Sequence, residues 1–180
     1  MESTGCKIVN ALYGNRMDGI SSQRQDEIAR ENLSIIARRA AQLRATVVLE
    51  TLNSYDSPLY PLTSLAATKK IVAAVRDSAG VDNVCLLFDV YHLHRMDYPL
   101  VEAVREAGTL IAHVQLADNP GRGRPGTGTI DFSGVLDELR RTGYDAYIGL
   151  EYMPSADVPD TLPEALAAHL RRASNHQEVS

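Results

Sequence analysis

Short apolar runs alternate with amphipathic segments along almost the whole chain. Five runs, rich in β-branched residues and of strand length, predict strands over 6–12, 46–52, 83–90, 110–116 and 146–152. The segments between them have helical spacing and predict helices over 25–43, 63–78, 98–107, 132–141 and 162–172. Thr63 or Ser64 is suited to cap the second helix. The pattern therefore predicts five strand–helix units in series.

The predicted strands are near-continuous apolar runs rather than alternating ones. Such strands are buried on both faces, as in a parallel sheet covered by helices. No linker rich in proline or serine divides the chain, so we expect a single domain over 1–180 with a polar, frayed tail over 173–180. Two α/β architectures fit this order of elements: an open doubly wound sheet, or part of a barrel of parallel strands.

Composition and charge exclude several classes of protein. The chain of 180 residues is 44% hydrophobic and carries a net charge of -5, which is unfavourable for gripping a nucleic-acid backbone. It has neither an apolar run long enough to span a membrane nor the pattern of a signal peptide. Cys6 and Cys85 lie in apolar runs without metal or redox spacing, and we expect two buried free thiols. These features favour a cytoplasmic protein that binds neither nucleic acid nor membranes.

Acidic or amide side chains follow the apolar run of four successive strands. They are Glu50, Asp89, Gln115 and Glu151. An ionised carboxylate is costly to bury alone, so several carboxylates at one rim indicate that a cation binds between them. Oxygen ligands suit a hard divalent ion such as magnesium or manganese. In a parallel barrel the carboxyl ends of the strands form the active-site rim, so we expect a metal-dependent active site there.

Basic and imidazole groups surround this set. His92 lies three residues after Asp89, on a predicted loop above the rim, and favours substrate contact. Arg124 lies in the glycine-rich segment 119–129, where a guanidinium can pair with a substrate carboxylate. That segment lacks the ending of a P-loop, so it is weak evidence for a nucleotide. His113 shares a strand face with Gln115 and is either a support for a ligand or a core histidine.

Four motifs in order give the chain a specific resemblance. The motifs LETLN, FDVYH, HVQLAD with the following GRPGTG, and GYDAYIGLEYMP resemble the hydroxypyruvate isomerase family of xylose isomerase-like TIM barrels. The resemblance runs from about residue 6 to residue 154. It implies an eight-stranded barrel with a divalent metal at the rim, held by two Glu, an Asp and a Gln or His. Here the matching positions are Glu50, Glu151, Asp89 and Gln115.

The same resemblance implies roles in catalysis. The two glutamates, Glu50 and Glu151, would be the acid/base pair that moves a proton through an enediolate. His92 and Arg124 would bind the substrate, a three-carbon keto acid or small sugar, and Asp56 matches a further carboxylate of some related epimerases. The implied activity is that of an isomerase interconverting hydroxypyruvate and 2-hydroxy-3-oxopropanoate. A sugar epimerase or dehydratase of the same barrel group is the alternative, and Gln115 in place of His favours the isomerase.

The chain departs from the family in length. It offers five strand–helix units of the eight, and residues 6–12 match the fourth strand of the family, so we expect a partial TIM (β/α) barrel. An arc of five strands leaves two edges and an apolar interior open. We therefore expect a fragment, a homo-oligomer that covers the open edges, or a separate chain that supplies the rest. A barrel segment that binds a metal or partner without turnover is the non-enzymatic alternative.

Overall fold

A computed structural model describes residues 5–155, 161–164 and 166–168 of the chain. Its strands are β1 (Ile8–Asn10), β2 (Thr46–Glu50), β3 (Val84–Asp89), β4 (Ile111–Leu116) and β5 (Ile148–Leu150). Its helices are α1 (Ser22–Gln42), α2 (Leu65–Ala79), α3 (Val90–Arg95), α4 (Leu100–Ala107), α5 (Phe132–Arg141) and the short 3₁₀ helix η1 (Gly108–Leu110). The five predicted strands and the first four predicted helices are confirmed. Of the predicted helix 162–172, Glu164 and residues 166–168 are helical and residues 162–163 are not; residues 165 and 169–172 and the predicted tail 173–180 lie outside the described residues.

Local capping explains where the structure differs from the predicted element ends. Helix α1 begins earlier than predicted because the Ser21 side chain accepts a hydrogen bond from the N–H of Arg24. Helix α2 is capped by Ser64 and ends at Gly80, which adopts a left-handed conformation at φ 67°. Helix α3 was not predicted: Asp89 ends β3 and also caps this helix by accepting from the N–H of His92. His92 therefore lies on a helix and not on the predicted loop.

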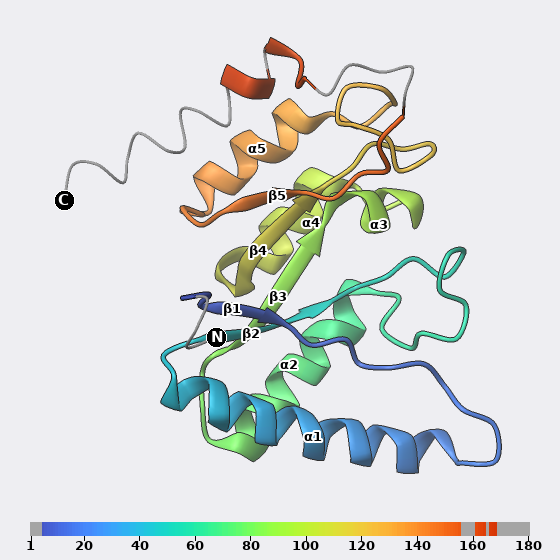
Figure 1. Cartoon of the computed structure of the whole chain (residues 1–180), viewed down its shortest axis with the longest axis vertical. Helices are drawn as coiled ribbons and strands as arrows, with labels where there is room; N and C mark the ends of the chain where they lie inside the picture. The colour runs from blue at the N-terminus through green and yellow to red at the C-terminus, as the bar shows by residue number, and fades with distance from the viewer. Residues whose placement is uncertain (1–4, 156–160, 165, 169–180) are drawn as a thin grey trace.

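The five strands form one parallel sheet in the order β1-β2-β3-β4-β5. The sheet curls, with α1 and α2 outside the β1–β2 end and α5 outside the β4–β5 end (Figure 1). This is the wall of a partial barrel with its helices on the outside, as predicted, and not an open sheet covered on both faces. Strands β1 and β5 each have one neighbour, so both ends of the sheet are open edges among the described residues.

Side chains alternate between the two faces of the sheet. The face toward the helices carries the main core, which includes Leu49, Phe88 and Leu116, all at most 1% exposed. The alternate residues Glu50, Asp89 and Gln115 point to the concave face. The packed helix side thus holds the sheet rigid, and the concave side presents polar groups at its carboxyl end.

The expectation of two buried thiols is wrong. Cys6 is exposed and Cys85 is partly exposed. Cys6 precedes β1, an edge strand with no described neighbour on its outer side, and Cys85 faces the concave side of β3, opposite the core residue Leu86. The two apolar runs correctly indicated strands, but they did not indicate which faces are covered. None of the described helices is long and apolar enough to cross a membrane.

Candidate active site and metal centre

The strand register brings the predicted rim residues to one side of the sheet. Asp89 pairs with Gln115 across β3 and β4, and Gln115 pairs with Gly149 across β4 and β5, so Glu151 follows two residues further on the same face. Glu50 pairs with Leu87, which alternates with Asp89 on that face. Because all strands are parallel, the four groups lie at the carboxyl ends of four adjacent strands.

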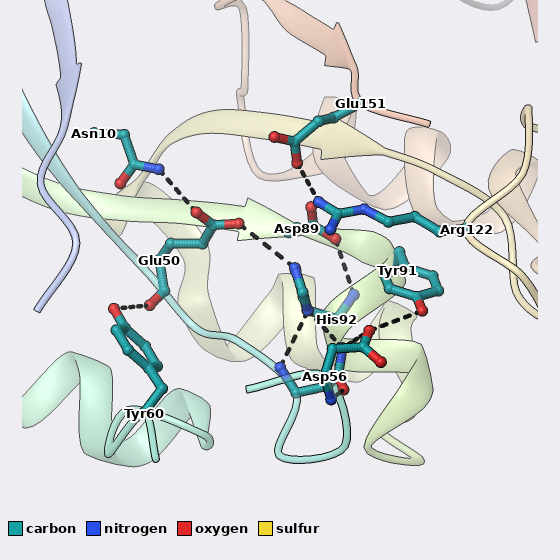
Figure 2. Close-up of polar contacts among 10 residues, drawn as sticks. Asn10, Glu50, Asp56, Tyr60, Asp89, Tyr91, His92, Arg122 and Glu151 are labelled. Atoms are coloured by element: carbon teal, nitrogen blue, oxygen red, sulfur yellow. Dashed lines mark hydrogen bonds and ion pairs between the residues drawn. The ribbon is translucent and has the colours of Figure 1, made fainter. Parts of the chain in front are cut away.

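Three of the groups at this rim are buried and close together. Glu50, Asp89 and His92 are at most 5% exposed, and one ligand atom from each lies within 4.8 Å of the others. The Glu50 carboxylate accepts a hydrogen bond from the Asn10 amide at 2.8 Å, and its backbone carbonyl accepts one from Tyr60 at 3.1 Å. Figure 2 shows these side chains converging from β1, β2, β3 and α3.

Burial changes the acidity of all three groups. It raises the pKa of the Asp89 carboxyl to about 7, and the charges of Glu50 and Glu151 add to that rise. It also raises the pKa of Glu50, although the hydrogen bond from Asn10 opposes this. Burial lowers the pKa of His92 to about 4, and the positive charge of Arg122 adds to the fall. His92 is therefore a neutral imidazole near pH 7, and within the described ranges no buried cation lies beside the two carboxylates.

The hydrogen bonds of His92 determine which ring nitrogen carries its proton. Nδ1 accepts from the backbone N–H of Asn53 at 3.1 Å, so in the neutral ring the proton is on Nε2. Nε2 lies 3.9 Å from a Glu50 carboxylate oxygen. The protonated Nε2 of His92 therefore points an N–H donor, and not a lone pair, toward Glu50. Although His92 is close enough to Glu50 and Asp89 to be a metal ligand, a protonated Nε2 cannot coordinate a metal and is suited to donate a hydrogen bond to the oxygen of a ligand.

Two buried oxygens at the rim lack hydrogen-bond partners among the described residues. They are Asp89 Oδ2 and Gln115 Oε1, which come from neighbouring strands. Leaving a buried acceptor unsatisfied is costly, and native proteins rarely do so without a ligand or water. With the carboxylates of Glu50 and Glu151, they form a set of oxygen donors only. These residues fit a hard divalent cation such as magnesium or manganese.

An arginine that was not predicted completes the site. Arg122 Nη2 donates to a Glu151 carboxylate oxygen at 2.6 Å, and its guanidinium lies 5.4 Å from the centre of the Tyr91 ring. Figure 2 shows it reaching between Glu151 and Tyr91. Its positive charge partly opposes the rise in pKa that burial causes at Glu50 and Asp89. It thus places a positive charge beside the carboxylates of the rim.

The structure does not bring Arg124 to this cluster. Its guanidinium donates to the backbone carbonyls of Pro125 and Thr161. Asp56 lies beside His92 but is engaged by Asn53, by the Tyr91 hydroxyl and by Arg95, contacts which together hold its pKa below the usual range. Its carboxylate supports the Asn53–His92 contact from behind.

His113 is on the concave face, two residues below Gln115, and half-buried. Gly149 lies against it: a Cβ there would be 3.3 Å from the His113 Nε2 atom. No hydrogen bond links His113 to the rim residues within the described part of the chain.

Sequence reasoning missed Arg122 and Asn10, for different reasons. Asn10 follows an apolar run in the same way as Glu50 and Asp89, so the strand-end pattern was sufficient to find it. Arg122 and Arg124 occupy equivalent places in the segment GRGR, and only the folded loop separates their roles.

The chain belongs to the family of xylose isomerase-like TIM barrels, whose model matches residues 1–173. A Streptomyces coelicolor protein named as a putative hydroxypyruvate isomerase is 43% identical over 86% of this chain and 56% of its own length. The hydroxypyruvate isomerase of Escherichia coli is 31% identical over 83% of this chain and 57% of its own length. The chain thus spans somewhat more than half the length of these relatives.

A solved structure confirms the fold. The crystal structure described as an AP endonuclease, family 2, from Brucella melitensis superposes with a TM-score of 0.76 at 26% identity, covering 84% of this chain and 57% of that one. The parallel order of the strands and the curl of the sheet are therefore those of a xylose isomerase-like barrel.

Proposed function

We propose that this chain carries the metal and proton-transfer site of an isomerase that interconverts hydroxypyruvate and 2-hydroxy-3-oxopropanoate. The observation that carries the proposal is the buried cluster of Glu50, Asp89 and His92. In it Asp89 Oδ2, like the neighbouring Gln115 Oε1, has no hydrogen-bond partner among the described residues. The similarity to proteins named as hydroxypyruvate isomerases supports the substrate.

Glu50, Asp89, Gln115 and Glu151 would hold the divalent cation. When bound, such an ion polarises a carbonyl and acidifies the neighbouring C–H. The raised pKa of Asp89, about 7, means that its proton must leave before it can act as a ligand, so we expect cation affinity to rise up to near neutral pH.

Glu50 and Glu151 are suited to move the proton. They come from β2 and from the end of β5, so they approach a bound substrate from two sides. One carboxylate removes a proton from C3 of hydroxypyruvate, which leaves an enediolate. The hydroxyl proton on O3 passes to O2, and the carboxylic acid of the other delivers a proton to C2. The two exchange roles in the reverse direction. The His92 Nε2–H donates a hydrogen bond to a substrate oxygen, and the Arg122 guanidinium binds the substrate carboxylate.

Hydrogen exchange with solvent tests this reaction directly. The protein with manganese is incubated with hydroxypyruvate in D₂O, and deuterium at carbon is followed by NMR. We expect deuterated product, and a fall of about 10²-fold or more in Glu50→Gln because a general base is lost. Asp82→Asn, an exposed carboxylate at the opposite end of the sheet, is the matched control. A full rate in Glu50→Gln contradicts the mechanism.

Calorimetry with manganese separates the remaining alternatives. One-site binding without turnover of hydroxypyruvate would support a barrel segment that binds metal but does not catalyse. Binding with turnover of ketose sugars instead would support the epimerase alternative. Absence of binding to the wild-type chain would overturn the proposed metal site.

A further inference from the structure

Asp118 follows β4 directly and has an unusual environment for a carboxylate. It is 0% exposed, and its carboxylate accepts three backbone N–H groups. Oδ1 accepts from Asn119 at 2.9 Å and from Ile130 at 3.1 Å, and Oδ2 accepts from Gly126 at 2.7 Å. Its own N–H donates to the carbonyl of Gly123 at 2.7 Å. A buried carboxylate held in this way is stable because the donors replace its water.

The four partners of Asp118 span the whole glycine-rich loop 119–130. The side chain bonds its first residue, Gly126 in its middle and its last residue, and the backbone N–H of Asp118 bonds Gly123, so Asp118 closes the loop from inside. The backbone at Gly128 packs directly on this carboxylate, because a Cβ there would lie 2.5 Å from Asp118 Oδ1 and 2.3 Å from the Asn119 carbonyl oxygen. Only glycine fits at this position without displacing the carboxylate.

Arg122 is presented to the active site by this closed loop. Its backbone has φ 54°, a left-handed conformation that is uncommon for a residue other than glycine. The Asp118 N–H holds the carbonyl of the next residue, Gly123, and the N–H of Met153 holds that of Arg122 at 2.8 Å. From this point the guanidinium reaches Glu151 (Figure 2).

We propose that Asp118 is a positioning residue that holds the glycine-rich loop so that Arg122 points at the rim carboxylates. The expected effect of Asp118 on binding of the substrate carboxylate rests on the proposed function. The expected effect of Asp118 on the loop and on the Arg122–Glu151 ion pair does not depend on that function, so the two effects are tested separately.

Chemical modification of arginine tests the positioning in the chain itself. Asp118→Asn keeps the size of the side chain but turns an amide N–H₂ toward backbone N–H groups. We expect phenylglyoxal to modify Arg122 about tenfold faster in Asp118→Asn, as the loss of a charged hydrogen bond predicts, with sites mapped by mass spectrometry. Glu151→Gln, which removes the partner directly, is expected to give a similar increase. Asp82→Asn should leave the rate unchanged, and Arg76, bonded to the Val84 carbonyl, is the internal reference.

A wild-type rate at Arg122 in Asp118→Asn overturns the proposal, whether or not Glu151→Gln raises it. Thermal melting establishes that each variant is folded. Should Asp118→Asn not fold, Gly128→Ala crowds the same carboxylate from the loop side and is expected to release Arg122 in the same way.

Kinetics test the consequence for the substrate. We expect Asp118→Asn to raise KM for hydroxypyruvate about tenfold with little change in kcat, and to add no further rise in an Arg122→Gln background. If Asp118 had a purely structural role, Asp118→Asn would lower the active fraction and kcat without changing KM. If the increases in KM were additive in the double variant, Asp118 would not act through Arg122, and the proposal would be overturned. Should the wild-type chain show no turnover, the proposed function fails while the modification result still decides the role of Asp118.

Discussion

The two halves of the rim are built differently. On the β2–β3 side, Glu50 and Asp89 are 5% and 1% exposed and have raised pKa values. On the β4–β5 side, the Glu151 side chain is 49% exposed and already paired with Arg122. Strands β2 and β3 have neighbours on both sides, whereas β5 is an edge of the described part of the sheet. The carboxylates at the ends of the two inner strands are thus buried, whereas the carboxylate after the edge strand is exposed to solvent and paired with a cation.

This difference suggests a division of labour. The buried half is rigid, since its side chains are tied to β1, α3 and the segment after β2 by hydrogen bonds. The other half receives its positive charge, that of Arg122, from the glycine-rich loop. We therefore expect the first half to dominate metal binding and proton transfer, and the second to tune the binding of the anionic substrate.

The largest expected effect is on kcat. Glu50→Gln removes a buried carboxylate of the proposed acid/base pair and should lower kcat by about 10²- to 10⁴-fold. Asp56→Asn, which changes the contacts of that carboxylate with Asn53, Tyr91 and Arg95 but removes no carboxylate of the buried cluster, should lower it far less. Steady-state assays with saturating manganese measure both, and equal losses in the two variants would contradict the special role of Glu50.

The next effect is on stability as a function of pH in the metal-free protein. The pKa of Asp89 is about 7 in the folded state against an ordinary 3.8, so between these values the folded protein binds more protons than the unfolded one. Stability contributed by this group is therefore complete below about pH 4 and is lost as pH rises to 7, by at most about 4 kcal/mol.

His92 acts in the opposite direction over part of that range. Its pKa is about 4 in the folded state against 6.5 ordinarily, so the stability associated with the neutral ring is lost as pH falls from 6.5 to 4. The difference in unfolding free energy between wild type and Asp89→Asn isolates the Asp89 contribution, measured by urea titration from pH 4 to 8. A difference that does not change with pH would show that Asp89 is not protonated in the folded state.

A smaller effect concerns manganese affinity. Asp89→Asn should weaken binding by about 100-fold, because a buried anionic ligand is lost, and Glu151→Gln by about tenfold, because that carboxylate is exposed and shared with Arg122. Calorimetry at pH 7.5 gives both dissociation constants. A larger loss in Glu151→Gln than in Asp89→Asn would reverse the proposed order of the two halves.

The smallest effect concerns the guanidinium. Arg122→Gln should raise KM for hydroxypyruvate about tenfold and leave the melting temperature nearly unchanged, since a partly exposed ion pair contributes little to stability. Arg124→Gln is the matched comparison, because it lies two residues away and its guanidinium contacts backbone carbonyls outside the cluster. A larger rise in KM for Arg124→Gln would restore the prediction made from the sequence.

Much of the fold was predictable because it depends on local pattern. The apolar runs identified all five strands, and the rule that parallel strands end at one rim identified Glu50, Asp89, Gln115 and Glu151 as rim residues. The same rule could have found Asn10. Helix α3 was missed because its cap, Asp89, also ends a strand, and the sequence does not separate these two roles.

The amino-acid sequence by itself determined the succession of strands and helices along the chain, the burial of the strands and the polar groups at their ends, since each follows from the pattern of a short segment. Only the tertiary structure decided which of these groups are buried, which nitrogen of His92 bears the proton, and that Arg122 rather than Arg124 faces the rim. These depend on contacts between distant segments, such as Asn53 with His92 and Asp118 with Ile130. Such contacts determine burial, hydrogen bonding and the direction of a side chain, and no local pattern encodes them.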